Sequence, residues 1–321
     1  MTDTSSELVT IFGGSGFVGT QIVQLLAHRG YRIRVAVRRP DLAGHVKPLG
    51  DVGQVVPIQA NVRSPDSVAR AVHGANIVIN LVGIGAERGK QRFDAIHAEG
   101  PRSIASAAAA TGASALVHMS VLGADPGSES VVSSSRAQGE AAVLAEFPGA
   151  VIMRPSLIFG PGDGFFNLMA TLARLSPVLP LIGGKTLFQP VYVKDVAEAF
   201  VIAATGGATP GAVYELGGPE VVTHRQILER ILKDTGRHNL LLPIPPGLGK
   251  LMAIPMGLLP TPLLTADQVT QLQVDNIVSA DAIAQLRTLP GLGIVPTPME
   301  AVLPGYLWRF RRNGQFDRQT A

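Results

Sequence analysis

The chain has 321 residues, of which 46% are hydrophobic and only 16% charged, and it carries a net charge of +3 and no cysteine. The lack of cysteine excludes disulfides, thiolate catalysis, zinc–thiolate sites and iron–sulfur ligation. Aromatic residues make up 5% and the basic residues are scattered, so we expect no nucleic-acid binding. The first ten residues hold neither a basic segment nor a long apolar one. We therefore expect no secretory signal, and a location in the cytoplasm or on the cytoplasmic face of a membrane.

The first 155 residues alternate short β-branched runs with helical stretches. The runs predict strands at Leu8–Phe12, Arg32–Val37, Val55–Gln59, Ile77–Leu81, Leu116–Met119 and Ala150–Met153. Helices are predicted between them at Val18–Ala27, Pro65–Val72, Phe93–Ala110 and Ser134–Glu146. Apolar strands joined by helices are typical of a parallel sheet covered on both faces. The predicted fold class is α/β, with a Rossmann-type doubly wound parallel sheet in residues 1–155.

After Pro155 the glycine and proline content rises and the regular alternation fades. The elements still predicted are a helix at Val193–Ala204, a strand at Val213–Leu216 and a helix at Thr223–Asp234. We expect residues 156–321 to form a smaller, irregular lobe that faces a substrate or partner, with elements of residues 186–216 returning to the first domain. Asp195 follows an apolar strand, and we expect it to be the N-cap of the next helix.

The run Leu251–Ala266 contains no charged residue. Three prolines interrupt it and it is shorter than the roughly 20 apolar residues of a membrane-spanning helix, so it is not a transmembrane segment. An apolar surface for a partner or a lipid headgroup layer is one interpretation. We favour the other, a buried part of the second lobe.

The first strand leads into a glycine-rich turn, Gly13-Gly14-Ser15-Gly16-Phe17-Val18-Gly19, and then directly into a helix. We expect Gly13 to allow the sharp turn, Gly16 to let backbone N–H groups approach a pyrophosphate, and Gly19 to allow close helix–sheet packing. The start of a helix also favours phosphate electrostatically. Strand, turn, helix and second strand follow in the order that a dinucleotide site requires, so the turn, with Ser15, Phe17 and Val18, predicts such a site.

The end of the second strand distinguishes the two nicotinamide dinucleotides. An acidic residue there would accept from the ribose 2′-hydroxyl of NAD, whereas an arginine would meet the 2′-phosphate of NADP. The strand ends in Arg38-Arg39-Pro40-Asp41, with no carboxylate at its tip. We therefore expect NADP(H) rather than NAD(H), with Arg38 as the first contact to the phosphate and Arg39 in support.

Two further strand ends are expected to line the same cofactor. Asn80-Leu81-Val82-Gly83, after the fourth strand, would lie along the adenine ribose and inner phosphate, and Asn61-Val62, after the third strand, would flank the adenine. No histidine–carboxylate cluster has the spacing of a metal site, so we expect no metal.

Several strings together resemble the atypical, extended short-chain dehydrogenase/reductases. They are the glycine-rich turn, the Val-Arg-Arg-Pro strand end, Arg136-Ala137-Gln138-Gly139-Glu140, Arg154-Pro155-Ser156-Leu157-Ile158-Phe159-Gly160 and Pro190-Val191-Tyr192-Val193-Lys194-Asp195. In active members of that superfamily a Tyr-x-x-x-Lys pair transfers the proton and holds the nicotinamide ribose. The resemblance places Arg136 at the lysine, Val132 at the tyrosine and Ser120 at the substrate-orienting serine. It also implies that Arg136, Pro155 and Ile158 contact the cofactor.

Valine cannot transfer a proton, and none of the four tyrosines has a lysine four residues later. His97 and His118 are candidate replacement acids, but a histidine in an amphipathic helix or a buried strand is more often a core residue. The cofactor site is therefore predicted to be kept and the proton-transfer site to be lost, which favours a structural or sensing nucleotide over one that turns over.

Within this superfamily the chain most resembles the group formed by the NADPH-binding accessory subunit of respiratory complex I (alpha-subcomplex subunit nine) and its bacterial relatives. The resemblance implies tightly held NADPH, no robust turnover and a place near the membrane as an accessory or assembly subunit of NADH:ubiquinone oxidoreductase. The apolar run and the arginines 309, 311 and 312 beside Trp308 fit such a place. The alternatives are an NAD(P)-dependent epimerase, dehydratase or reductase with an atypical proton donor, and an NADP(H)-sensing regulator.

Overall fold

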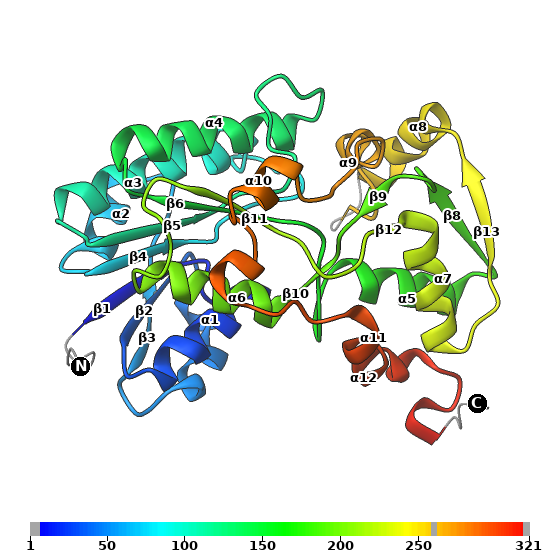
Figure 1. The fold of residues 1–321 in the computed structure, drawn as a ribbon, viewed down its shortest axis with the longest axis horizontal. Helices are drawn as coiled ribbons and strands as arrows, with labels where there is room; N and C mark the ends of the chain where they lie inside the picture. Colours follow the sequence, from blue (N-terminus) through cyan, green and yellow to red (C-terminus); the bar gives the residue numbers. More distant parts are fainter. Residues whose placement is uncertain (1–6, 258–261, 317–321) are drawn as a thin grey trace. The chain divides into compact units, whose positions relative to one another are not determined.

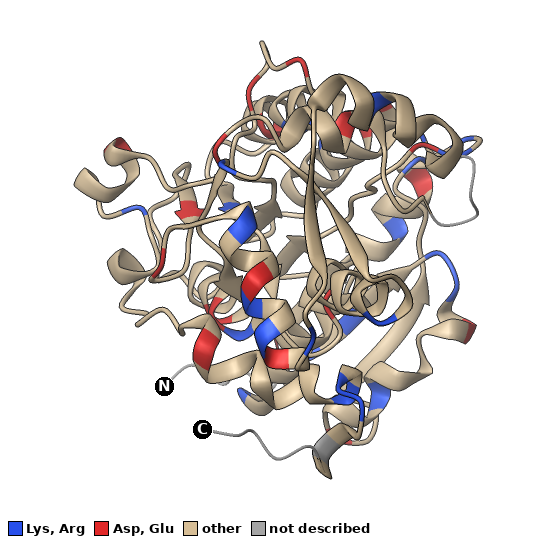
Figure 2. Ribbon diagram, turned by 90° about the vertical axis from the view of Figure 1, so that its right-hand side faces the viewer, with Lys and Arg blue, Asp and Glu red and all other residues tan. Residues whose placement is uncertain are grey.

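The computed structural model describes residues 7–257 and 262–316, which form two compact units. The first unit holds the described residues up to Pro155, together with Val193–Leu216 and Ser279–Val295. The second holds Ser156–Tyr192, the described part of Gly217–Val278, and the described residues from Pro296 onward. Most of the ribbon carries no charged residue, as the composition implies (Figure 2).

The first unit is built on a seven-stranded sheet in which every pairing is parallel (Figure 1). Its strand order is β11-β6-β5-β4-β1-β2-β3. The strands are β1 (Leu8–Phe12), β2 (Arg32–Val37), β3 (Val55–Gln59), β4 (Ile77–Asn80), β5 (Ala115–Met119), β6 (Val151–Pro155) and β11 (Val213–Leu216). The chain runs outward from β1 to β3 and then returns to the other side of β1, so the carboxyl ends of β1 and β4 flank a topological switch point.

Helices cover both faces of this sheet (Figure 1). One face carries α1 (Phe17–His28) and α6 (Val193–Ala204), and the other carries α2 (Pro65–Val72), α3 (Gly100–Ala110) and α4 (Val131–Glu146). Between the second group and the sheet lies an apolar core that includes Phe12, Val78, Leu116, Ile152, Val68, Ile104 and Val143. The predicted doubly wound α/β fold is confirmed. Asp195 is the third residue of α6 and not its N-cap, because the helix already begins at Val193.

The predicted helix over Phe93–Ala110 is divided into a π-helix at Asp94–Glu99 and α3. Pro101 has no N–H to bond the carbonyl of His97 four residues earlier, which favours a change of helical geometry at this point. The freed carbonyl lies against α4, where a Cβ added to Gly139 would come within 1.9 Å of it. The glycine of the Arg-Ala-Gln-Gly-Glu string is thus required for close packing.

An ion cluster joins α4, β6 and β11 in the first unit. Arg154 donates to Glu140 from Nε over 2.8 Å and from Nη2 over 2.6 Å, and its Nη1 lies 3.9 Å from Glu215. The hydrogen bond with Glu140 and the nearby carboxylate charges raise the pKa of Arg154, and they outweigh the effect of burial, which lowers it. Two strings that the sequence analysis treated as separate motifs therefore bind each other.

The segment Ser279–Val295, with α10 (Ala280–Ala284), belongs to the first unit, although the sequence analysis assigned it to the second lobe. It lies along the edge strand β11. The Ser279 N–H donates to the Glu215 carboxylate over 2.7 Å, and the Glu215 N–H donates to the Arg287 carbonyl over 2.9 Å. These bonds satisfy backbone and carboxylate groups at the open edge of the sheet.

The second unit combines short strand pairs with helices. Its strand pairs are β7 (Ile158–Phe159) with β10 (Val191–Tyr192), β8 (Val178–Ile182) with β13 (Leu240–Ile244), both parallel, and β9 (Leu187–Phe188) with β12 (Val222–Thr223), antiparallel. Its helices are α5 (Phe165–Leu175), α7 (His224–Thr235), α8 (Pro246–Gly257), α9 (Ala266–Gln271), α11 (Met299–Val302) and α12 (Pro304–Leu307). The core packs Phe159 and Phe166 against Leu228, Ile231 and Leu303.

The apolar run Leu251–Ala266 is described except for residues 258–261, which lie outside the described part of the chain. Our expectation that it is buried is wrong for two of its largest side chains: Leu251 is 62% exposed and Ile254 63% exposed on α8. Ala253 is buried beneath them. Within the described residues, no helix is long and apolar enough to cross a membrane.

Candidate dinucleotide site in the first unit

The glycine-rich turn closes on itself after β1. Gly13 has a positive φ of +79°, which favours glycine, and the Gly16 N–H donates to the Gly13 carbonyl over 3.0 Å. A Cβ added to Gly19 would lie 2.5 Å from the Gly13 carbonyl oxygen and 2.6 Å from the Gly14 Cα. Gly19 therefore keeps the turn compact. The atoms nearest a Cβ at Gly19 belong to this turn, whereas the sequence predicts a role for Gly19 in packing between helix and sheet.

Helix α1 begins at this turn without a side-chain cap. Gly16 is the N-cap and has no side chain to accept from the first turn, and that turn contains no acidic residue. The N–H groups of the first turn of any helix lack partners within the helix. Ser15 and Phe17 are half-buried, while Val18 packs inside. The N-terminus of α1 thus offers backbone N–H donors without a side-chain cap, at the place where a phosphate binds in such folds.

The two arginines after β2 differ in their partners. Arg39 Nη2 lies 2.7 Å from the Asp41 carboxylate, and both side chains are exposed. This hydrogen bond raises the pKa of Arg39 and lowers that of Asp41. Arg38 is also exposed, and in the part of the chain that the structure describes no carboxylate pairs with it. Of the two arginines, Arg38 is therefore the one whose charge is not paired with a carboxylate in the described chain.

A histidine that the sequence analysis missed also reaches the glycine-rich turn. His45, in a 3-10 helix at Gly44–Leu49, donates from Nε2 to the Ser15 carbonyl over 3.1 Å. No motif marks this residue, because the contact depends on how the segment after β2 folds back over the turn.

The end of β4 lies directly beside the turn. A Cβ added to Gly13 would lie 3.4 Å from the Leu81 carbonyl carbon, and the Leu81 N–H donates to the Phe12 carbonyl over 3.0 Å. Asn80 is buried, donates to His118 Nδ1 over 3.0 Å and accepts from the Val82 N–H over 3.1 Å. Its amide therefore fixes the strand end and is already engaged within the protein.

The segment after β3 is fixed by its own hydrogen bonds. The Asn61 side-chain oxygen accepts from the Arg63 N–H over 3.2 Å, and the Asn61 backbone N–H donates to the Ser67 hydroxyl over 3.0 Å. The Val62 side chain is buried in the core that covers the sheet. An adenine at this strand end would thus meet Asn61 and the backbone of Val62.

Arg136 connects the carboxyl ends of β4 and β5. It is buried on α4 and donates from Nη1 to the Met119 carbonyl over 3.0 Å and to the Val82 carbonyl over 3.5 Å. A Cβ added to Gly83 would lie 1.8 Å from its Nη2, so the missing side chain of Gly83 makes room for it. Burial lowers the pKa of Arg136 to about 10, so the guanidinium stays charged at neutral pH.

At the tyrosine position of the family, Val132 is half-buried on α4 and its carbonyl ends a chain of hydrogen bonds. His97 Nε2 accepts from the Ile84 N–H over 3.1 Å, which leaves the proton on Nδ1 to donate to Ser135 over 3.0 Å. The Ser135 hydroxyl donates in turn to the Val132 carbonyl over 3.0 Å. His97 is thus fully hydrogen-bonded in the core.

Neither candidate histidine is an acid near neutral pH. Burial lowers the pKa of His97 to about 3, helped by the nearby charge of Arg136. The same two causes lower the pKa of His118 to about 3. His118 accepts from Asn80 at Nδ1, and its buried Nε2 has no partner. Both rings are therefore neutral and cannot release a proton as imidazolium.

The tyrosines lie elsewhere in the described structure. Tyr31 directly precedes β2 and so lies at the amino end of that strand, whereas the glycine-rich turn lies at the carboxyl end of β1. The Tyr214 hydroxyl accepts from the Thr209 N–H over 3.1 Å. Tyr192 and Tyr306 belong to the second unit, where Tyr306 donates to Asp163 over 2.6 Å. Within the described part of the first unit, no tyrosine occupies the place on α4 that proton transfer would need.

The remaining predicted site residues are divided between the units. Ser120 follows β5, and its hydroxyl is buried without a partner. Pro155 ends the neighbouring strand β6, and its carbonyl accepts from the Leu122 N–H over 3.0 Å. Ile158 lies on β7 of the second unit. Among residues 7–257 and 262–316, no three histidine, aspartate or glutamate side chains gather as a metal site would require.

The fold and this edge of the sheet define a member of the short-chain dehydrogenase/reductase class. Residues 9–217 match the NAD dependent epimerase/dehydratase family, which covers well over half of the chain, and the protein belongs to that family. The resemblance inferred from the sequence strings is confirmed.

The chain is also similar to individual proteins within and beyond this family model. The mitochondrial NADH dehydrogenase [ubiquinone] 1 alpha subcomplex subunit 9 of Arabidopsis thaliana is 36% identical over 97% of this chain and 79% of its own length. A Caulobacter vibrioides protein named ceramide reductase is 33% identical over 63% of this chain and 62% of its own. The crystal structure of gox2253 has a TM-score of 0.72 at 22% identity, covering 96% of this chain and 99% of that one. At that identity it supports the fold alone.

Proposed function

We propose that the first unit holds NADP(H). The uncapped start of α1 would face the pyrophosphate, Arg38 would pair with the ribose 2′-phosphate, and the ends of β3 and β4 would line the adenosine half. The pairing of Asp41 with Arg39 supports this choice over NAD(H), because the nearest carboxylate after β2 is already engaged. When bound, the nicotinamide would supply a hydride donor or acceptor.

We further propose that this nucleotide is held without turnover. The observation that carries this is the pair of replacements on α4. Val132 offers only its carbonyl at the tyrosine position, and Arg136 commits its guanidinium to the carbonyls of Met119 and Val82. Burial lowers the pKa of Arg136 only to about 10, so its guanidinium stays protonated near neutral pH. Among the described residues, the tyrosine and lysine positions can therefore help to orient a nucleotide but offer no side chain that donates a proton near neutral pH.

The role that this supports best is that of an accessory or assembly subunit of NADH:ubiquinone oxidoreductase, complex I. A relative that matches nearly the whole chain, the Arabidopsis thaliana protein, is named as a subunit of that enzyme. A protein with this role would bind other complex I subunits and lie at the cytoplasmic face of the inner membrane. The exposed leucine and isoleucine of α8 support such a contact.

A native gel of gently solubilised membranes tests this role. In cells that carry a tagged copy of this chain, the tag is expected to comigrate with NADH-dehydrogenase activity. A copy of Gly19→Ala at the same expression level shows whether an intact nucleotide site is needed for assembly. If the unmodified chain runs only as a free protein while the active complex is intact, the accessory role is refuted.

A second candidate is an NADPH-dependent reductase, favoured by the relative named ceramide reductase and by the unpartnered Ser120 hydroxyl. A hydroxyl buried without a partner at a strand end is costly unless a ligand satisfies it. In this function a carbonyl oxygen would accept from Ser120, and the proton would come from water. If the protein is a reductase, a carbonyl compound is expected to oxidise the NADPH bound to it.

A further inference from the structure

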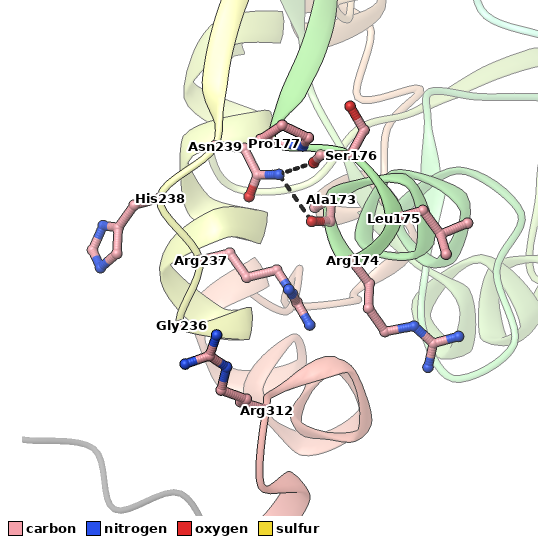
Figure 3. Close-up of a pocket in the computed structure, with 10 residues that line it drawn as sticks. All are labelled: Ala173, Arg174, Leu175, Ser176, Pro177, Gly236, Arg237, His238, Asn239 and Arg312. Carbon is pink, nitrogen blue, oxygen red and sulfur yellow. Dashed lines mark hydrogen bonds between the residues drawn. The ribbon is translucent and has the colours of Figure 1, made fainter.

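The second unit contains a cavity of about 440 Å³ where α5 and α7 end (Figure 3). Its walls come from the end of α5, from the segment between α7 and β13, and from the C-terminal segment. The side chains that carry charge or titrate in its lining are Arg174, Arg237, His238 and Arg312. None of the lining residues is acidic.

Only part of this positive charge is used by the protein. Arg237 runs between the ends of the two helices (Figure 3). It donates from Nε and Nη2 to the Phe310 carbonyl, over 3.3 and 3.0 Å. The Arg312 head lies beside Gly236, the Arg174 side chain extends from α5 away from Arg312, and the His238 ring points outward (Figure 3). Arg174 and Arg312 are exposed, and no carboxylate in the described chain pairs with either.

Stabilisation of the helix ends is the simpler explanation for these arginines, because cations are favourable near helix C-termini. The carbonyls at these ends, however, already have other donors. Asn239 donates from its amide to the carbonyls of Ala173 and Ser176, which closes the end of α5. At the end of α7, the Thr235 hydroxyl and the Arg237 N–H both donate to the Leu232 carbonyl. Arg174 and Arg312 are therefore not needed as caps.

The neighbouring arginines of the C-terminal segment show the same contrast. Arg309 donates to the Asn167 side-chain oxygen, and Arg311 donates to the Asp234 carbonyl over 2.8 Å. Both therefore anchor this segment to α5 and α7. Arg312, directly after this anchored stretch, is the one of the three that lines the cavity.

We infer that this cavity binds a phosphate group carried by an anionic ligand. Arginine presents a planar fork of N–H donors that matches phosphate oxygens, and three arginines in a lining without an acidic residue give the cavity a net positive charge. Asn239 and Arg237 fix its walls before a ligand arrives. The site lies wholly within the second unit, so the inference stands apart from the nucleotide proposed for the first unit.

The phosphate could come from a soluble molecule or from a phospholipid headgroup. The lining residue Leu175 is 72% exposed and Leu240, next to Asn239, is 63% exposed. Exposed leucines beside arginines are suited to a headgroup with acyl chains nearby, because apolar and charged groups then meet matching parts of the lipid.

The test compares two variants that remove the same charge. Arg174→Gln/Arg312→Gln alters the cavity, and the control Arg102→Gln/Arg225→Gln removes two exposed arginines that lie elsewhere, each beside a glutamate. Thermal unfolding of both variants checks that the fold is kept. One arm measures binding of inorganic phosphate by calorimetry. The other measures cosedimentation with phosphatidylglycerol vesicles, with phosphatidylcholine vesicles as the neutral reference.

Loss of two charge-assisted hydrogen bonds is expected to weaken binding by roughly tenfold or more in the cavity variant, while the control binds as the unmodified protein does. Phosphate binding identifies a soluble ligand, and binding of phosphatidylglycerol vesicles without phosphate binding identifies a headgroup. The inference is overturned if the unmodified protein binds neither probe, or if the cavity variant binds as tightly as the control.

Discussion

The Arg136 guanidinium lies beside Gly83, where a side chain would begin: a Cβ at Gly83 would be 1.8 Å from Nη2. The arginine that replaces the family's lysine is longer and carries a planar, branched head. The site accommodates it by leaving a glycine at the end of β4 and by engaging it with the carbonyls of Val82 and Met119. The replacement is thus built into the edge of the sheet on which the nucleotide would lie.

Substitution Gly83→Ala is therefore expected to displace the Arg136 head and lower the free energy of unfolding by about 1–3 kcal/mol, as for other overpacked sites. It is also expected to weaken NADPH binding. Gly85→Ala is the control, because a Cβ there meets nothing within 4 Å. Urea unfolding and NADPH fluorescence titration measure the two effects. If both variants have the same free energy of unfolding and the same NADPH affinity, the Arg136 head adapts to the added methyl group without loss of stability or binding.

Gly19→Ala tests the compact turn after β1. The added methyl group would collide with backbone atoms of Gly13 and Gly14, which cannot rotate away as a side chain would. We expect the turn to open and NADPH affinity to fall by roughly tenfold or more, as expected when donors to a phosphate are misplaced. Gly44→Ala, with open space around its Cβ, should bind NADPH normally. An unchanged titration for Gly19→Ala would remove the turn from the proposed site.

The two arginines after β2 should differ in their effect on nucleotide choice. Arg38→Ala is expected to reduce the preference for NADPH over NADH by roughly tenfold or more, because a charge-assisted bond to phosphate contributes about 1.5–3 kcal/mol. Arg39→Ala should change it less, since Arg39 is paired with Asp41. Titrations with both nucleotides measure the ratio. A larger effect for Arg39, or no preference in the unmodified protein, would contradict the assignment.

The buried histidines predict a pH dependence of stability. The pKa of His97 falls from 6.5 in the unfolded chain to about 3 when folded, so the unfolded state binds the extra proton first. Stability is complete above about pH 6.5 and is lost as the pH falls toward 3. Between pH 7.5 and 5.0 one such histidine contributes a loss of about 2 kcal/mol.

His97→Gln should remove this share of the loss, while the exposed His28→Gln should not. Urea unfolding at pH 7.5 and 5.0 gives the difference for each variant. If His97→Gln loses as much stability between the two values as the unmodified protein, His97 is not the neutral core residue described here.

Where local pattern determines structure, the sequence predicted it well. The strands β1, β2 and β3 match at both ends, because apolar runs end at turn residues. The sequence does not predict the break before Pro101, since proline is tolerated early in a helix and the close packing of Gly139 on the freed His97 carbonyl depends on a distant helix. The return of Ser279–Val295 to β11 depends on hydrogen bonds to Glu215 over a long sequence separation, which no local pattern carries.

In the candidate site, too, local motifs are predicted from the sequence and contacts between distant segments are not. Its glycines and the replacement of the tyrosine by Val132 are visible in the sequence because they belong to spaced motifs. The contact of His45 with the turn, the pairing of Arg39 with Asp41 and the commitment of Arg136 to two carbonyls arise only when separate elements meet. The exposure of Leu251 and Ile254 likewise depends on what α8 packs against.

We propose above that this protein holds NADPH and does not turn it over. A direct measurement follows the NADPH absorbance of the loaded protein during incubation with a panel of carbonyl compounds, against free NADPH as reference. If the nucleotide is held without turnover, the absorbance stays constant and intact NADPH is recovered from the protein afterwards. Oxidation of the bound nucleotide by any member of the panel, faster than that of free NADPH, would show turnover and identify the protein as a reductase.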